Sequence, residues 1–124
     1  MIDHLSIGCS DINRAKDFYK KIFELFESKI IHESSECIGF KFSSGAALWI
    51  APPLDNTQSY VASNSFHLCF RASSRDVVDK FYNLAIELGA TCEGGPGIRD
   101  VYGPNYYAAY ARDPEGNKIE AAIY

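Results

Sequence analysis

The strongest constraint on the fold of this chain is an internal repeat. The segment from His4 to Ile7 reads HLSI and resembles HLCF at His67 to Phe70, an offset of 63 residues. The same offset, carried forward without a gap, places Phe18-Tyr19 on Phe81-Tyr82. Repeated sequence at a fixed spacing is typical of a duplicated structural unit. The 124 residues are therefore predicted to form two related modules.

Each copy is predicted to begin with a short strand that leads into an amphipathic helix. Apolar residues recur at three- and four-residue spacing in both helical stretches, which is typical of a helix with one buried face. Ser10 or Asp11 can cap the first helix by accepting from its free backbone N–H groups. Ser73 and Asp76 resemble a capping box at the start of the second helix, and Gly89 is expected to end it.

Three short strand-like stretches follow each predicted helix. A glycine in the turn before the last stretch, Gly45 in one copy and Gly116 in the other, indicates a β-hairpin in each. These glycines lie 71 positions apart, and the same offset makes Trp49 the counterpart of Glu120. The expected strands cover residues 29–32, 37–42 and 46–51 in the first copy, and 91–94, 106–112 and 117–124 in the second.

The sequence therefore predicts an α+β fold made of two tandem βαβββ modules. The first module is expected over residues 1–51 and the second over residues 66–124. Residues 52–65 are rich in Pro, Asn, Ser and Thr and are expected to link them. One such module alone cannot bury a whole sheet face. Two curved mixed sheets packed together would instead form one cleft.

The charge balance excludes some classes of partner. The net charge is −4 and the pI is about 5.3, whereas a general nucleic-acid or anionic-membrane binder needs a basic face. We expect a cytoplasmic protein, because the N-terminal sequence resembles no leader and no apolar run reaches membrane-spanning length. The four cysteines form no C-x-x-C pair and are expected to be reduced.

Three residues stand out as candidate metal ligands, namely His4, His67 and Glu120. The two histidines occupy equivalent positions on the first strand of each copy, so a pseudo-twofold axis would bring them to facing positions in the cleft. Glu120 lies between Ile119 and Ala121 in an otherwise apolar strand, where an unpaired buried carboxylate would be costly. Two imidazoles and one carboxylate leave open coordination positions on Fe, Mn, Zn or Ni.

A plainer interpretation stays open for each of these residues. A single strand histidine is more often a packed or surface residue than a ligand, and a glutamate near a C-terminus is usually solvated. The same holds for the tyrosines of the last hairpin, which can simply pack the sheet.

The pairing of the last two strands decides which tyrosine faces the cleft. If residues 114–115 form a two-residue hairpin tip, Ala109 lies opposite Glu120 and Tyr107 shares the face of Glu120. A single bulge would put Tyr106 there in place of Tyr107, because a one-residue shift reverses every side chain.

Other residues are expected to line or cover the cleft. Ser6 lies two residues after His4 and should face the same way. Trp49 can supply an apolar wall, although core packing explains this residue equally well. The segment 94–105 is rich in Gly and Pro and is expected to cover the site. The residues expected to bind substrate are Ser6, Trp49, Arg99, Tyr102 and Tyr106.

The chain resembles the vicinal oxygen chelate superfamily over essentially its whole length. That superfamily includes glyoxalase I, extradiol dioxygenases, fosfomycin-resistance thiol transferases and bleomycin-resistance proteins. Its members place metal ligands on the first and last strands of each module, which implies the set His4, His67 and Glu120. The residues that carry the resemblance are IDHL at 2–5, Phe18-Tyr19, His67-Leu68 and DPEGNKIE at 113–120.

The resemblance implies a metal-dependent enzyme that binds two adjacent oxygens of a small molecule at the open metal positions. Lyase, isomerase or ring-cleaving dioxygenase chemistry would follow, with Glu120 and Tyr107 as catalytic candidates. Trp49 stands where glyoxalase I has a carboxylate, which favours the His-His-Glu classes over a true glyoxalase. The alternatives are a metal-free binding protein of the bleomycin-resistance type and a fosfomycin-type thiol transferase. A homodimer is expected.

Overall fold

The computed structural model of the protein describes residues 1–55 and 57–124. It divides into two compact units, Met1–Ala62 and Ser63–Tyr124. Asn56, which falls within the predicted linker, lies outside the described residues. No helix of the described residues is long and apolar enough to cross a membrane.

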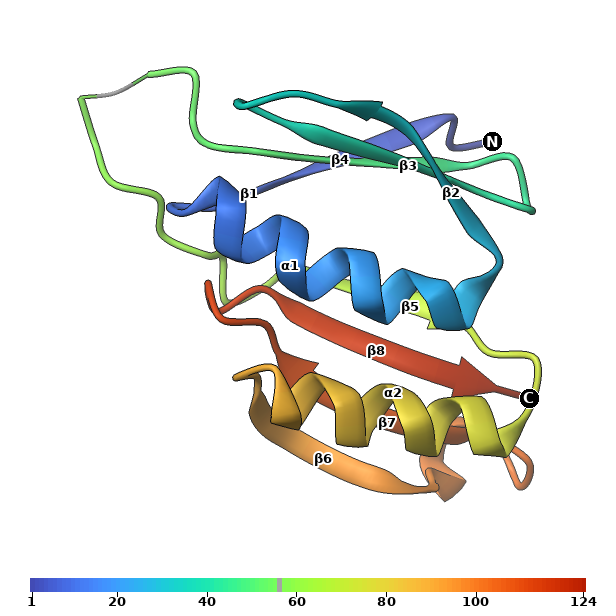
Figure 1. The fold of residues 1–124 in the computed structure, drawn as a ribbon. Helices are drawn as coiled ribbons and strands as arrows, with labels where there is room; N and C mark the ends of the chain where they lie inside the picture. Colours follow the sequence, from blue (N-terminus) through green and yellow to red (C-terminus); the bar gives the residue numbers. More distant parts are fainter. Residues whose placement is uncertain (56) are drawn as a thin grey trace. The chain divides into compact units, whose positions relative to one another are not determined.

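The first unit is a βαβββ module with one mixed sheet (Figure 1). Its strands are ordered β1-β4-β3-β2. β1 runs parallel to β4, whereas the other neighbouring pairs are antiparallel. The elements in chain order are β1 (His4–Gly8), α1 (Ile12–Phe23), the 3-10 helix η1 (Glu24–Phe26), β2 (Ser28–Glu33), β3 (Ile38–Phe42) and β4 (Ala47–Ala51).

The second unit repeats this topology. Its sheet has the order β5-β8-β7-β6, again with the first pair parallel and the others antiparallel. The predicted α+β fold of two βαβββ modules is therefore confirmed. The elements are β5 (His67–Arg71), α2 (Arg75–Glu87), β6 (Thr91–Ile98), the 3-10 helix η2 (Asp100–Tyr102), β7 (Tyr107–Arg112) and β8 (Lys118–Ile123).

Side-chain caps start both α-helices. Asp11 caps α1, and its Oδ1 accepts from the backbone N–H of Arg14 at 3.0 Å. α2 is capped by Ser74, whose Oγ accepts from the N–H of Val77 at 3.3 Å. The prediction of Ser73 as the cap was wrong by one residue, because the extended backbone that an N-cap requires falls at Ser74. Gly89 follows α2 at a φ of +97°, the left-handed conformation that ends a helix.

Strand β6 is longer than the sequence suggested. It continues through the Gly-rich stretch to Ile98 and pairs with β7 across two register shifts. The expected covering segment 94–105 was therefore wrong over its first half, which is strand. Glycine and proline are tolerated there because β6 is an edge strand with irregular pairing.

The core of the second unit lies between α2 and one face of its sheet. Phe81 of α2 is fully buried, as are Ala109 of β7 and Ala121 of β8. These two alanines are cross-strand partners, so their small side chains leave room for the helix. Burial of the aromatic ring removes a large apolar surface from water.

Replacing Phe81 by Ala is expected to lower the free energy of unfolding by about 3–5 kcal/mol, because a fully buried ring is lost and a cavity is left. Denaturant unfolding of the purified variant measures this. Asn83→Ala on the exposed side of α2 is the matched control and should change stability by less than about 0.5 kcal/mol. Equal stability of the two variants would contradict this packing.

Candidate functional site

Glu120 is the one buried glutamate of the described residues, and it lies at the centre of the second sheet. Only 2% of its surface is exposed. Its parallel neighbour on β5 is Cys69, and its antiparallel partner on β7 is Tyr110. A carboxylate this deeply buried needs polar partners to offset the loss of water.

Both carboxylate oxygens of Glu120 have such partners. The hydroxyl of Tyr106 donates to Oε1 at 2.7 Å. The ring Nε2 of His67 lies 3.2 Å from Oε2. The two contacts hold the carboxylate in one orientation, with Oε2 turned toward the imidazole of the first strand of this unit.

Three side chains around Glu120, Tyr106 among them, are held in their protonated forms. Burial, followed by the hydrogen bond to Glu120, raises the pKa of Tyr106 above its ordinary range. The same two causes raise the pKa of Tyr110. Partial burial, together with the negative charge of Glu120, raises the pKa of Cys69 to about 12. At neutral pH these side chains therefore present O–H and S–H groups and add no negative charge.

The spacing of His67 and Glu120 fits two ligands of one metal ion. Ligand atoms about 2.1 Å from a metal and at a right angle to one another are about 3.0 Å apart. Nε2 and Oε2 are 3.2 Å apart, so both could bind a shared ion with little movement. Within residues 63–124, no third His, Cys, Asp or Glu joins this pair closely enough to hold a metal. This unit therefore supplies two of the three predicted ligands.

His4, the third predicted ligand, lies on β1 of the first unit. Its Nδ1 is 2.8 Å from Oδ1 of Asp3. Many metal-binding histidines are oriented in this way, with a carboxylate on one ring nitrogen and the metal on the other. The contact therefore leaves Nε2 of His4 as the nitrogen suited to coordination.

The first unit carries an equivalent strand pair with different chemistry. Ser6 of β1 pairs with Trp49 of β4 as Cys69 pairs with Glu120 in the second unit. Trp49 lies opposite Gly39, and a Cβ at Gly39 would come within 2.9 Å of the indole ring. The indole thus fills the space that this glycine leaves open, and the first unit presents no carboxylate there.

The predicted pairing of the last hairpin was wrong by one residue. Tyr110, not Ala109, lies opposite Glu120. The loop has three residues because the N–H of Gly116 donates to the carbonyl of Asp113 at 2.9 Å, and Gly116 has a φ of +93°. This is the arrangement of a type I turn followed by a glycine bulge.

The extra loop residue places Tyr107 on the opposite face of the sheet. Its hydroxyl donates to Oδ1 of Asp79 on α2 at 2.7 Å, and its ring lies 4.9 Å from the guanidinium carbon of Arg75. The expected sharing of a face by Tyr107 and Glu120 is therefore corrected, and Tyr106 has that position instead. A one-residue change of register has this effect on every side chain.

The other expected residues of the second unit contact the tyrosines that neighbour Glu120. The ring of Tyr102 is 5.3 Å from that of Tyr106. The guanidinium of Arg99 lies 5.4 Å from the ring centroid of Tyr110. The sequence reasoning missed Tyr110 and Cys69, although Cys69 could have been found as the residue two positions after His67 on the same strand face.

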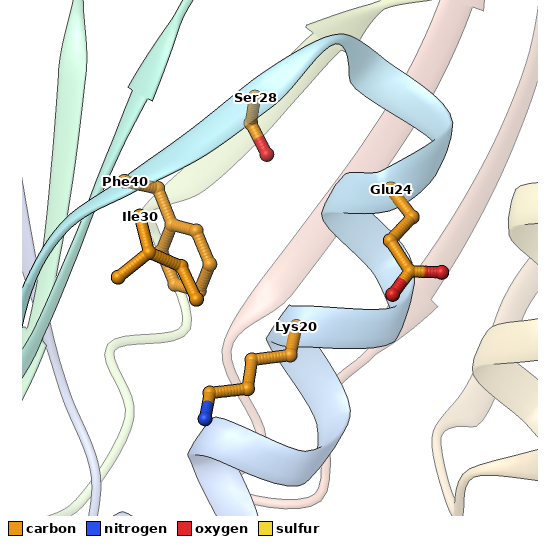
Figure 2. Close-up of a pocket in the computed structure, with 5 residues that line it drawn as sticks. All are labelled: Lys20, Glu24, Ser28, Ile30 and Phe40. Atoms are coloured by element: carbon orange, nitrogen blue, oxygen red, sulfur yellow. The ribbon is translucent and has the colours of Figure 1, made fainter.

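A separate hollow lies in the first unit beside α1. It has a volume of about 300 Å³. Figure 2 shows that Lys20 comes from α1 and Glu24 from η1, which continues it, and that two others lie side by side on neighbouring strands. The lining contains neither histidine nor cysteine, so it does not match the chemistry of a His-His-Glu site. The residues are Lys20, Glu24, Ser28, Ile30 and Phe40.

Comparisons with known proteins show the family to which this chain belongs. A family model described as the Glyoxalase/Bleomycin resistance protein/Dioxygenase superfamily matches residues 1–121. The chain belongs to this superfamily. A glyoxalase/bleomycin resistance protein from Albidiferax ferrireducens is similar to this superfamily member, with 31% identity, a TM-score of 0.84, and coverage of 98% of this chain and 97% of that one.

Two more distant solved structures share the superfamily fold. One is a lactoylglutathione lyase from Agrobacterium tumefaciens, at 22% identity and a TM-score of 0.68, with 98% of this chain and 92% of that chain covered. The other is a glyoxalase-related enzyme from Fulvimarina pelagi, at 16% identity and a TM-score of 0.81, with 100% and 88% covered. No curated protein matches the chain.

Replacing Tyr106 by Phe is expected to lower stability by about 1–3 kcal/mol near neutral pH, because Oε1 of buried Glu120 loses its donor. The difference from the wild type should shrink above about pH 10. There the unfolded chain loses the tyrosine proton, whereas the raised pKa of Tyr106 keeps it in the folded state. The wild type therefore loses this part of its stability as the pH rises.

Denaturant unfolding of both proteins between about pH 8 and about pH 11 checks this expectation. Tyr102→Phe, which alters an exposed tyrosine of the same cluster, should change stability little and serves as the control. A wild-type advantage that stays constant over the whole range would contradict the proposed role of the Tyr106 hydroxyl.

Proposed function

We propose that this chain is a metal-dependent enzyme that binds a small molecule through two adjacent oxygen atoms. His4, His67 and Glu120 would hold one divalent ion of Fe, Mn, Zn or Ni. The single observation that carries the proposal is the 3.2 Å separation between Nε2 of His67, whose side chain is half-exposed, and Oε2 of the buried Glu120. The proposal requires the sheet faces of the two units to converge in one cleft.

The donor set fits such an ion in charge and in number. Two neutral imidazoles and one carboxylate leave one net positive charge on a divalent metal, together with open positions for substrate oxygens. When bound, the metal would supply Lewis-acid stabilisation of negative charge on those oxygens. Lyase, isomerase and ring-cleaving dioxygenase reactions all use this kind of stabilisation.

Neighbouring residues of the chain would orient the metal ligands and fix their protonation. Tyr106 holds Oε1 of Glu120, which directs Oε2 toward His67. Asp3 accepts from Nδ1 of His4, which fixes the ring tautomer. Tyr106 therefore takes the place that the sequence suggested for Tyr107, as a positioning residue for the ligand carboxylate.

Proton chemistry at this site differs from that of a glyoxalase with two carboxylates. Trp49 stands at the position equivalent to Glu120 and cannot accept a proton. Tyr110 and Cys69 keep their protons at neutral pH because their pKa values are raised. Neither would therefore act as the base. Glu120 remains the candidate base, which would have to loosen from the metal to act.

The direct contact between His67 and Glu120 also favours a second candidate function. An imidazole 3.2 Å from the carboxylate satisfies Glu120 without a metal. A binding protein of the bleomycin-resistance type would then use the same tyrosine-lined face for an organic ligand.

Metal analysis separates these two functions. We expect the purified protein to bind about one divalent ion per chain, and His4→Ala, His67→Ala and Glu120→Gln each to weaken that binding at least about 10-fold. His32→Ala, at an exposed histidine of β2, is the matched control and should bind metal as the wild type does. Protein that contains no metal, and gains none on incubation with Fe, Mn, Zn or Ni salts, would rule out the proposed enzyme.

A further inference from the structure

Three positively charged side chains lie on the same face of the second sheet as Glu120. We call Arg71, Arg99 and Lys118 the cationic rim. The chain as a whole carries a net charge of −4, so this grouping runs against the overall balance. Within residues 63–124, no carboxylate lies within ion-pair distance of any of the three.

Arg71 approaches the site through stacked aromatic rings. It lies on β5, two residues after Cys69, so the two share a face of the sheet. Its guanidinium carbon is 4.2 Å from the ring centroid of Tyr124. That ring stacks on Tyr106 at a centroid distance of 5.0 Å and an interplanar angle of 10°. The guanidinium and Tyr106, the tyrosine that binds Glu120, therefore both contact the ring of Tyr124.

Arg99 lies in a cradle made by glycine. Its Nη2 donates to the carbonyl of Gly95 at 2.6 Å. A Cβ at Gly94 would be 3.2 Å from Nη2, and one at Gly97 would be 3.1 Å from Nη1. The missing side chains of β6 therefore make room for the guanidinium beside the ring of Tyr110, at 5.4 Å from the ring centroid.

Lys118 completes the cationic rim from β8. It lies two residues before Glu120 on the same face, and its Nζ is 5.4 Å from the ring centroid of Tyr110. Its cross-strand partner Arg112 differs, because Arg112 is already paired with Glu93 at 2.6 Å. The side chains of the cationic rim are thus oriented by aromatic rings and by a backbone carbonyl. Their charges are not neutralised by a carboxylate of residues 63–124 and can attract an anion.

We propose that the substrate of this site carries an oxyanion group, such as a carboxylate, in addition to its two adjacent oxygens. Guanidinium groups bind planar carboxylates through paired N–H donors, and orientation in advance lowers the entropic cost of that binding. The net positive charge expected on the metal centre would also attract an oxyanion. The binding of the two adjacent oxygens rests on the proposed function. The binding of the oxyanion rests on the cationic rim alone.

Catechol and 3,4-dihydroxybenzoate form a matched pair of probes, because they share two adjacent hydroxyls and differ by one carboxylate. Titration calorimetry with metal-loaded protein should give a dissociation constant about 10-fold lower for 3,4-dihydroxybenzoate. Arg71→Gln and Arg99→Gln should each reduce that advantage, and the double variant should remove it. The advantage should also decrease as salt is added.

Arg75→Gln is the matched control, because Arg75 stacks on Tyr107 on the opposite face of the sheet. It should leave the preference between the probes unchanged. Equal affinities for the two probes, or a preference that survives the double variant, would overturn the inference, as would failure of both probes to bind. The metal content and the catechol affinity of the same samples report separately on the proposed metal site, so the two failures are distinguishable.

Discussion

The second unit is organised around one buried carboxylate. Glu120 is 2% exposed, and its two oxygens are engaged by different partners, the hydroxyl of Tyr106 and the imidazole of His67. Because burial of an unpartnered carboxylate is costly, these contacts constrain the register of β8, the side chains on β7 and the rotamer of the histidine together. The cationic rim and the protonated tyrosines are arranged around the same group.

The two units differ at the position of this carboxylate. The parallel pairs β1–β4 and β5–β8 are equivalent, and each presents a histidine and a small side chain two residues later. At the next equivalent position, one pair has Trp49 against a glycine and the other has Glu120 against a tyrosine. The same backbone therefore carries an apolar side chain at this position in one unit and a carboxylate in the other.

The sequence was sufficient to predict the fold and to single out His67 and Glu120, which the structure brings together, but not the side-chain detail around them. The repeat located both modules, because periodic apolar residues and turn glycines report directly on burial and on backbone conformation. Tyr107 was assigned to the wrong face because the length of the loop around Gly116 could not be read from the sequence. One extra residue in that loop moves every side chain of the paired strand to the other face of the sheet. The glycine cradle of Arg99 was taken for part of a covering loop. Its role depends on contacts across β6 and β7, which no local pattern records.

The central claim is that His67 and Glu120 form part of a metal site that also includes His4. X-ray absorption spectroscopy at the edge of the bound metal tests it most directly, because this method identifies the first-shell ligands. The account predicts two imidazoles and one carboxylate in the wild type, and the loss of one imidazole in His4→Ala. A first shell containing a single imidazole, or one unchanged by His4→Ala, would contradict it.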